Sequence, residues 1–410
     1  MASPGFKKAL LCTVTLCFWF AQYIYVPFLT PYLLSLAISA TAAGVIIGAY
    51  GVTQMVLRIP LGLTLDIYRQ HKLVILIGVL LAGLSSLGML LFPSPGMLFL
   101  ANALSGVASS AWISYTILYN SYFDSAHSTK AIGFITMLMQ TGILLAFMTG
   151  GLLFSHFGIQ MLFKVSFASG MIGAALSLSI PHETASKGTN VTLASLLKVI
   201  RDKRVVTFSL LAAVAWFVVF ATVFSFTTST AKSLGATGPQ LGVLSMLHCA
   251  GTIAGAWFIT TRLGHSLGEK KPLSMGFIIL ALYCVFIGLA GGLWPFYPLQ
   301  LICGFGNGLL LSATMAFAIK YVDAEKKTTA MGCFQSIYCI GITSGPVVMG
   351  ALIDHGGKRA AFFAVGIASL ASAVLVTLGC MPGIGTSPAS PANSAGSPTP
   401  DHCPLTTLIE

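Results

Sequence analysis

The chain has 410 residues, of which 56% are hydrophobic and only 8% are charged, and its formal net charge is +11. Because soluble proteins carry roughly a quarter charged residues, this composition excludes water as the main solvent of the folded chain. The positive charge does not indicate a nucleic-acid-binding protein either, since most of the 21 Lys and Arg fall in every second connection between apolar runs.

The apolar residues form runs long enough to cross a membrane. A helix rises about 1.5 Å per residue and the hydrocarbon core is roughly 30 Å thick, so about 20 residues suffice. Since every backbone amide in lipid must be bonded internally, such runs are predicted to be helices. In chain order the predicted helices are 9–35, 42–65, 72–93, 95–118, 131–154, 160–180, 206–230, 239–262, 272–292, 295–319, 331–353 and 360–381.

These helices divide the chain into four predicted parts. Residues 1–180 form an N-terminal six-helix bundle and residues 206–381 a C-terminal one, with a polar central loop at 181–205. Residues 382–410 are rich in Ser, Pro, Gly and Ala, a composition typical of a disordered tail. The bias of Lys and Arg predicts that both termini, the loop and the tail are cytoplasmic, with the chain in the inner or plasma membrane.

The two halves repeat each other. Tyr122-Phe123-Asp124 matches Tyr321-Val322-Asp323 at an offset of 199, the difference between 321 and 122. The same offset carries Gly151 onto Gly350 and Gly158 onto Gly357, and an offset of 198 carries Gly44 onto Gly242 and Gly106 onto Gly304. An offset that persists through loops and glycines indicates two parallel six-helix halves, a known transporter plan with a binding site between the halves near mid-membrane.

The connection between the second and third helices carries a motif. It reads Arg58-Ile-Pro-Leu-Gly62-Leu-Thr-Leu-Asp66-Ile-Tyr-Arg69-Gln-His-Lys72, and this resembles the signature loop of the major facilitator superfamily. Gly62 would let another helix approach closely, and Asp66 can pair with Arg69 or Lys72 or face the positive end of a helix. The resemblance implies a cytoplasmic latch made of Arg58, Gly62, Asp66, Arg69 and Lys72 against the eleventh helix, closed when the protein opens outward. The alternative is an ordinary solvated loop with a basic cluster.

The resemblance covers the chain from the first to the twelfth helix. It implies an all-α integral membrane protein with twelve transmembrane helices in two pseudo-symmetric six-helix bundles. It implies a secondary active or facilitative transporter that works by alternating access, not an enzyme, with no cofactor and no metal. The chain departs from the drug antiporters of this family, because Asn102 stands where they have an arginine and Gly142 has no proline beside it.

The resemblance also implies that the first, fourth, seventh and tenth helices line the substrate cavity. Polar and aromatic residues on these helices are the candidates for substrate contact, although each could instead bond or pack against a neighbouring helix. They are Gln22, Tyr23, Tyr25, Tyr32, Ser110, Trp112, Ser114, Tyr115, Trp216, Phe220, Asn307 and Ser312.

His248 is the one ionisable side chain that the sequence places in a helix middle, so it is the candidate for carrying a coupling proton. The alternative is a neutral histidine bonded to a neighbouring helix. A cavity without fixed charge predicts a small neutral, zwitterionic or amphipathic organic substrate that is exported or exchanged. An importer of a neutral metabolite and a transporter-like sensor remain alternatives. The expected partners are the small-molecule substrate, the lipid bilayer and, if His248 titrates, protons; nucleic acid is not among them.

Overall fold

The computed structural model describes residues 4–68, 70–123, 128–181, 202–261, 266–320, 322 and 327–379, and within these ranges every regular element is a helix. Most of the predicted central loop and all of the predicted tail lie outside them. The elements are α1 (Pro4–Tyr23), α2 (Val26–Ser35), α3 (Ala40–Tyr68), α4 (His71–Leu91), α5 (Pro95–Ser110), α6 (Trp112–Asn120), α7 (Ser128–Leu178), α9 (Lys203–Ala221), the π-helix η2 (Thr222–Phe226), α10 (Thr227–Ser233), α11 (Gly238–Thr260), α13 (Lys270–Leu289), α14 (Phe296–Ile319) and α15 (Lys327–Leu378).

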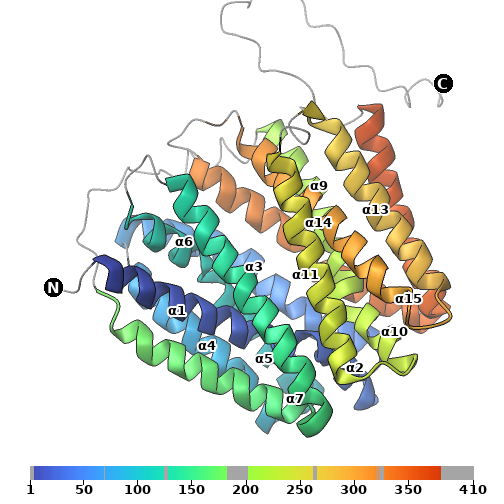
Figure 1. Ribbon diagram of the computed structural model, residues 1–410, viewed down its shortest axis with the longest axis horizontal. Coiled ribbons are helices and arrows are strands. Elements are labelled where there is room, and N and C mark those ends of the chain that lie inside the picture. Colours follow the sequence, from blue (N-terminus) through green and yellow to red (C-terminus); the bar gives the residue numbers. More distant parts are fainter. Residues whose placement is uncertain are drawn as a thin grey trace, which may run out of the picture.

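The described residues contain ten continuous helical spans that are long and apolar enough to cross a membrane. Two of them, with 46 and 49 residues, would each be roughly 70 Å long if straight, more than twice the hydrocarbon thickness. Each turns at a glycine, Gly158 with φ 69° and Gly357 with φ 77°, and Figure 1 shows α7 and α15 each as two rods that meet at the lower side of the view. Counting each long span as two gives the twelve segments that the sequence predicts.

Three further segments are interrupted, one of them the fourth, which breaks at Ala111 between α5 and α6. The first segment breaks between α1 and α2, at Ile24 and Tyr25, because Pro27 has no backbone N–H to donate and its ring disfavours the helix one turn earlier. The seventh segment passes from α9 through the π-helix η2 into α10. π-helical turns are rare in proteins overall, but those that occur are often found at functional sites.

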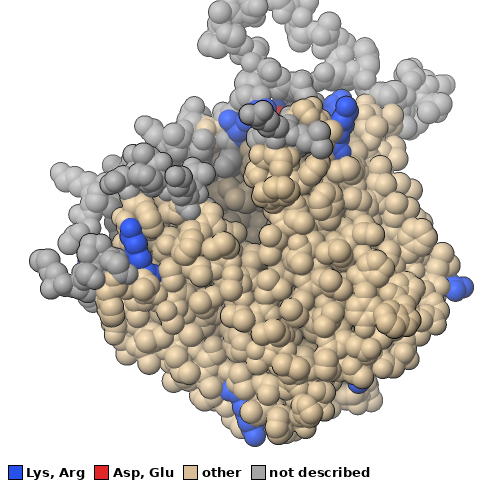
Figure 2. Space-filling view, in the orientation of Figure 1, with Lys and Arg blue, Asp and Glu red and all other residues tan. Residues whose placement is uncertain are grey.

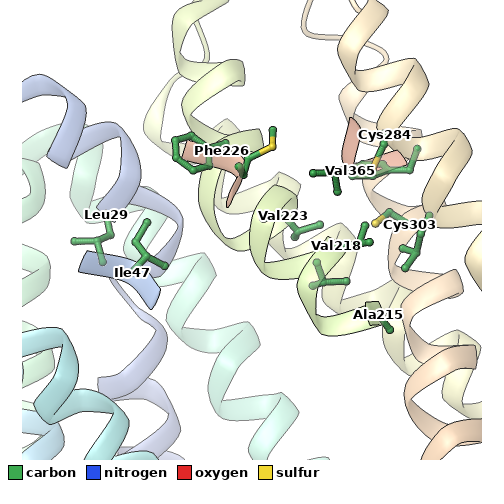
Figure 3. Close-up of a cluster of buried hydrophobic side chains, with 14 of the residues drawn as sticks. Leu29, Ile47, Ala215, Val218, Val223, Phe226, Cys284, Cys303 and Val365 are labelled. Atoms are coloured by element: carbon green, nitrogen blue, oxygen red, sulfur yellow. The ribbon is translucent and has the colours of Figure 1, made fainter. Parts of the chain in front are cut away.

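A continuous buried core joins the segments. It contains Leu29 of α2, Ile47 of α3, Val218 of α9, Phe226 of η2 and Val365 of α15, and Figure 3 shows how these side chains lie across the helices. A second core packs α1, α4, α6 and α7 together. Large apolar side chains also remain exposed around the outside, and Figure 2 shows a broad charge-free area in the middle of one face with Lys and Arg towards its rims. This surface suits hydrocarbon and not water.

The connections alternate between two sides of the molecule. We use "terminal side" for the side of Pro4, of the α3–α4 and α6–α7 connections and of the start of α15. We use "far side" for the side of the α2–α3 and α10–α11 connections and of the turns at Gly158 and Gly357. On the far side, Lys358 Nζ donates to Ser233 Oγ at 3.0 Å, and on the terminal side, Lys72 Nζ donates to the Leu178 carbonyl at 2.7 Å.

Candidate functional site

A cavity of about 40 Å³ lies between α1, α2, α3, α5 and the α9–η2 segment. Its lining residues come from both halves of the chain and are Gln22, Tyr23, Tyr25, Val26, Leu29, Ile47, Tyr50, Asn102, Ser105, Phe220 and Phe224. A volume of this size holds a few water molecules but not a drug-sized ligand, which needs several hundred Å³. An organic ligand would therefore require the two halves to separate at the cavity.

One wall of the cavity is a polar network within the first half. Gln22 Nε2 donates to the Ser105 carbonyl and to Ser109 Oγ, both at 3.0 Å, and Gln22 Oε1 accepts from Ser105 Oγ. The Tyr50 hydroxyl bonds to Ser109 Oγ at 2.7 Å. Asn102 Nδ2 donates to the Ile46 and Ile47 carbonyls of α3 at 2.8 and 3.1 Å. These bonds fix α1, α3 and α5 against one another at the level of the cavity.

The aromatic part of the lining spans the two halves. Tyr23 of α1 packs edge-on against Phe224 of η2, with ring centroids 6.2 Å apart, and Tyr50 of α3 stacks on Phe220 of α9 at 6.3 Å. Phe220 and Phe224 also contact each other. The π-helix places Phe224 on the cavity, so the break in the seventh segment shapes this wall.

Four of the twelve candidate residues, Gln22, Tyr23, Tyr25 and Phe220, line the cavity. Trp216 lies behind the wall, with its ring 5.5 Å from that of Phe220. The other seven candidates lie away from the cavity. In the first half, Tyr32 packs on Phe163, Trp112 and Tyr115 pack on each other, Ser114 bonds to His71, and Ser110 bonds to the Gly106 carbonyl. In the second half, Asn307 lies beside His248, and Ser312 is half-buried on α14.

His248 is buried, with 3% of its surface exposed. Its Nε2 lies 3.5 Å from Asn307 Nδ2, its ring meets Phe224 edge-on, and its Nδ1 has no hydrogen-bond partner. No carboxylate of the described ranges forms an ion pair with it. His248 therefore stands one side chain behind the cavity wall, with Phe224 between.

The expectation that lysine and arginine avoid the helix middles is wrong for Arg58. This residue lies well inside α3, which continues to Tyr68, and only 6% of its surface is exposed. It contacts Tyr338 of α15 across the boundary between the halves. The sequence placed Arg58 near the cytoplasmic end of the second predicted helix, because its contact with Tyr338 of α15 is not visible in the local pattern.

The sequence reasoning also missed the contribution of α3 to the cavity. Tyr50, Gln54 and Arg58 recur at every fourth position, so they share one face of an otherwise apolar helix. Such a polar stripe in a membrane helix faces protein or water and not lipid. This spacing was the signal that could have found Tyr50.

On the far side, the two halves are in tight contact through glycines. A Cβ on Gly44 of α3 would lie 2.1 Å from the Pro346 carbonyl oxygen of α15, and one on Gly350 would lie 2.2 Å from the Ala40 carbonyl oxygen. Between α7 and α11, a Cβ on Gly242 would lie 2.7 Å from the Phe147 carbonyl oxygen and 3.1 Å from the Gly151 Cα. Asp354 adds a polar contact, because it accepts from the backbone N–H groups of Ala40 and Thr41 at 3.1 and 2.8 Å. The far side is closed in this structure.

Three described glycines towards the terminal side make no such contact. A Cβ on Gly62, Gly133 or Gly332 would meet no atom of another element within 4 Å, and Figure 2 shows a recess between the halves on this side. The close helix approach expected at Gly62 is thus absent in this conformation, in which α3 and α15 pack against each other from Gly44 to Arg58. Arg69 and the Asp66 side chain of the predicted latch lie outside the described parts of the chain.

Comparison with known proteins identifies a family. A model described as Major Facilitator Superfamily matches residues 11–230 and 210–400. Among curated proteins, the chain is 26% identical over 245 residues to a multi-drug resistance efflux pump PmrA homolog of Lactococcus lactis, which covers 57% of this chain and 59% of that protein. It is 26% identical over 105 residues to an uncharacterized MFS-type transporter of Mycobacterium tuberculosis, covering 26% and 18%. It is 28% identical over 129 residues to rat synaptic vesicle glycoprotein 2B, covering 32% and 19%. The matches span less than two thirds of each relative.

Solved structures share the fold over almost the whole chain. The nucleoside transporter NupG superposes with a TM-score of 0.71 at 16% identity, covering 92% of this chain and 98% of that one. A bacterial homologue of the human lysosomal transporter Spinster, in an inward-facing and occupied conformation, gives a TM-score of 0.74 at 15% identity, covering 93% and 98%. These similarities confirm the predicted two-bundle helical membrane fold.

Proposed function

The chain belongs to the major facilitator superfamily, and from that premise we propose that it is a secondary transporter that works by alternating access. It is an MFS-type transporter by family, with many membrane-spanning helices. The observation that carries the mechanism is the asymmetry between the two sides. The halves touch backbone to backbone at Gly44 and Gly350 on the far side, whereas a Cβ on Gly62, Gly133 or Gly332 towards the terminal side would meet no atom within 4 Å.

The proposed motion is a rocking of the two bundles about the cavity. Opening the far side separates α3 from α15 and α7 from α11, and it brings the terminal ends of these helices together. In that second state Gly62 and Asp66 would reach α15, as the latch predicts. The cavity lies between the halves, so it is exposed to each side in turn.

We propose that the substrate is a small amphipathic or zwitterionic organic molecule, and that the protein exports or exchanges it. The aromatic wall of Tyr23, Tyr50, Phe220 and Phe224 suits an apolar body, and the Gln22 network suits a polar group. The partial match to an efflux pump homolog supports export. We place the terminal side in the cytoplasm and the chain in the cell membrane, because most Lys and Arg belong to terminal-side connections.

Two measurements test this proposal. A thermal-shift screen of the purified protein against drugs, dyes and polar metabolites at two pH values identifies ligands, since a ligand that binds only the folded state raises the melting temperature. The compounds that stabilise the protein are then assayed for transport in proteoliposomes. We expect amphipathic compounds to stabilise the protein and to be transported; stabilisation without transport of any of them would contradict a transporter.

The same screen tests His248. If His248 carries the coupling proton, ligand stabilisation and transport change with pH in the natural protein and lose that dependence in His248→Ala. Equal pH dependence in both proteins would leave His248 as a packing residue against Phe224 and Asn307. Stabilisation by one class of neutral metabolites, with uptake and not efflux, would favour the importer instead.

A further inference from the structure

The most unusual side chain in the described residues is the buried guanidinium of Arg58. Its Nη1 donates to the Tyr338 hydroxyl at 2.7 Å and its Nη2 donates to Gln54 Oε1 at 2.6 Å, and both acceptors are neutral. Its Nε has no hydrogen-bond partner, and none of the ion pairs among the described residues includes it. A buried charge without a counter-ion is costly in protein or lipid, and within the described residues no carboxylate pairs with Arg58.

The guanidinium points toward the cavity. Side chains of an α-helix lean toward its N-terminus, and the bond to Gln54 shows that Arg58 reaches back by one turn. Gln54 in turn donates to the Tyr50 carbonyl, and Tyr50 lines the cavity. The charge therefore lies about one helical turn, roughly 5 Å along the axis, from the level of Tyr50.

Two more hydrogen-bond donors of the other half lie in the same cluster of side chains, on Tyr338 and Trp216. The Tyr338 hydroxyl accepts from Arg58, so its own proton is available for another acceptor. The indole Nε1–H of Trp216 is buried and has no partner. Tyr338 lies against the guanidinium, with Arg58 Cζ 5.3 Å from the centre of its ring, and the Trp216 ring packs on Tyr338 with the ring centroids 5.6 Å apart.

We propose that Arg58, Trp216 and Tyr338 form a binding site for a carboxylate group of the substrate, whose apolar body lies in the neighbouring aromatic cavity. A carboxylate accepts several hydrogen bonds and pairs with the planar guanidinium in a bidentate manner. The three residues come from α3, α9 and α15, so the anion would bridge the two halves that move. This inference rests on the proposed transport function and narrows its substrate class to amphipathic or zwitterionic molecules with one carboxylate.

A single guanidinium also limits the charge of the ligand. One cation neutralises one carboxylate, and a second negative charge would lie buried among Phe220, Trp216 and Cys339 without a partner. A neutral ligand, conversely, would leave Arg58 without a counter-ion. The site therefore favours a monoanionic head group over both a polyanion and an uncharged one.

The experiment compares a carboxylate with its neutral isostere. The purified full-length protein is titrated with 4-phenylbutyrate and with 4-phenylbutyramide, and binding is followed by thermal shift and by equilibrium titration. We expect the carboxylate to bind and the amide to bind at least roughly tenfold more weakly, the loss typical of a missing charge-assisted hydrogen bond. No binding of the carboxylate, or equal binding of both compounds, overturns the site.

Three variants locate the binding site. Arg58→Gln is expected to lower carboxylate affinity by roughly tenfold to one hundredfold and to leave the weak amide binding unchanged. Trp216→Phe removes only the indole N–H and is expected to give a smaller loss, which keeps the test valid if Arg58→Gln does not fold. The matched control is Lys164→Gln, which removes one positive charge from an exposed position on α7. A loss in Lys164→Gln equal to that in Arg58→Gln, or unchanged affinity in both Arg58→Gln and Trp216→Phe, contradicts the proposal.

Transport of the same two compounds separates this inference from the proposed function. If the carboxylate binds in an Arg58-dependent manner but does not cross proteoliposome membranes, the transport function fails and the anion site stands. If amphipathic compounds are transported equally well by the natural protein and Arg58→Gln, without preference for a carboxylate, the anion site fails and the transport function stands.

Discussion

Two glycines hold backbone conformations that other residues avoid. Gly158 has φ 69° and ψ −174°, and Gly357 has φ 77° and ψ 167°, a region that is essentially restricted to glycine. Both lie at far-side turns where a 46- or 49-residue span must reverse. Their separation, 357 minus 158, is the repeat offset of 199, so the same turn is built twice.

These turns give the first prediction. Gly158→Ala and Gly357→Ala should each destabilise the fold by about 1–3 kcal/mol through backbone strain alone, since the space around both glycines is open. Thermal unfolding of the purified variants measures the effect. Gly96→Ala is the control, because Gly96 also has open space but no positive φ. Melting temperatures of the two turn variants equal to that of the control would contradict the strain argument.

Asp354 provides a second prediction at the same scale. Its carboxylate accepts from the backbone N–H groups of Ala40 and Thr41 and from Thr41 Oγ1, the last at 2.7 Å, and so caps α3 from the other half of the chain. Losing a cap of this kind costs about 1 kcal/mol when the side chain is replaced by alanine, so Asp354→Ala should shift the protein towards the state open on the far side. Spin labels at Leu36 and Leu234, both exposed near the far side, report the distance across it. The control is His355→Gln, which changes the neighbouring exposed residue and should leave the distance distribution unchanged. An equal shift in both variants would show that the Asp354 cap does not hold the far side closed.

The packing of α3 against α15 gives a prediction for a helix pair. A Cβ on Gly44 would lie 2.1 Å from a backbone oxygen that cannot move aside easily, and overpacking typically costs about 1–3 kcal/mol. Gly44→Ala should therefore lengthen the Leu36–Leu234 distance by weakening far-side closure. The same measurement on Gly96→Ala should match the natural protein. A Gly44→Ala protein with the natural distance distribution would show that this glycine contact does not hold the far side closed.

Much of the helix arrangement could be predicted from the sequence, because membrane helices depend on local properties. Run length and apolar composition indicated the segments, and the glycine repeat at Gly158 and Gly357 marked two turns before any packing was known. The break between α1 and α2 at Ile24 and Tyr25 also has a local cause, because Pro27 cannot donate a backbone hydrogen bond. The π-helix η2 and the break between α5 and α6 carry no comparable local signal, and neither was expected.

The site was less predictable, because it depends on contacts between distant segments. Gln22, Tyr23, Tyr25 and Phe220 were identified through helices assigned by resemblance, and the structure places them on the cavity. Tyr50 was missed because α3 was not expected to line it. The burial of Arg58 depends on Tyr338, 280 positions away in the sequence, and the residue pattern of α3 alone cannot predict so distant a partner. The polar stripe through Gln54 was visible, but its partner was not.

For the whole molecule, the latch predicts a kinetic effect. Asp66→Asn should slow transport while leaving the protein folded and in the membrane, because the carboxylate is expected to stabilise the state closed on the terminal side. The initial rate of substrate movement in proteoliposomes measures this, with the melting temperature as the control for folding. An unchanged rate in a folded Asp66→Asn protein would leave this segment as an ordinary basic connection.

The central claim, that two bundles expose one cavity to each side in turn, is tested most directly by distances measured on both sides of one protein. In a variant without native cysteines, spin labels at Leu36 and Leu234 report the far side, and labels at Tyr68 and Thr260, the exposed ends of α3 and α11, report the terminal side. The account predicts two populations with opposite changes: a short far-side distance with a long terminal-side distance, and the reverse, in proportions that a bound ligand alters. A single distribution at both pairs, the same with and without ligand, would contradict alternating access.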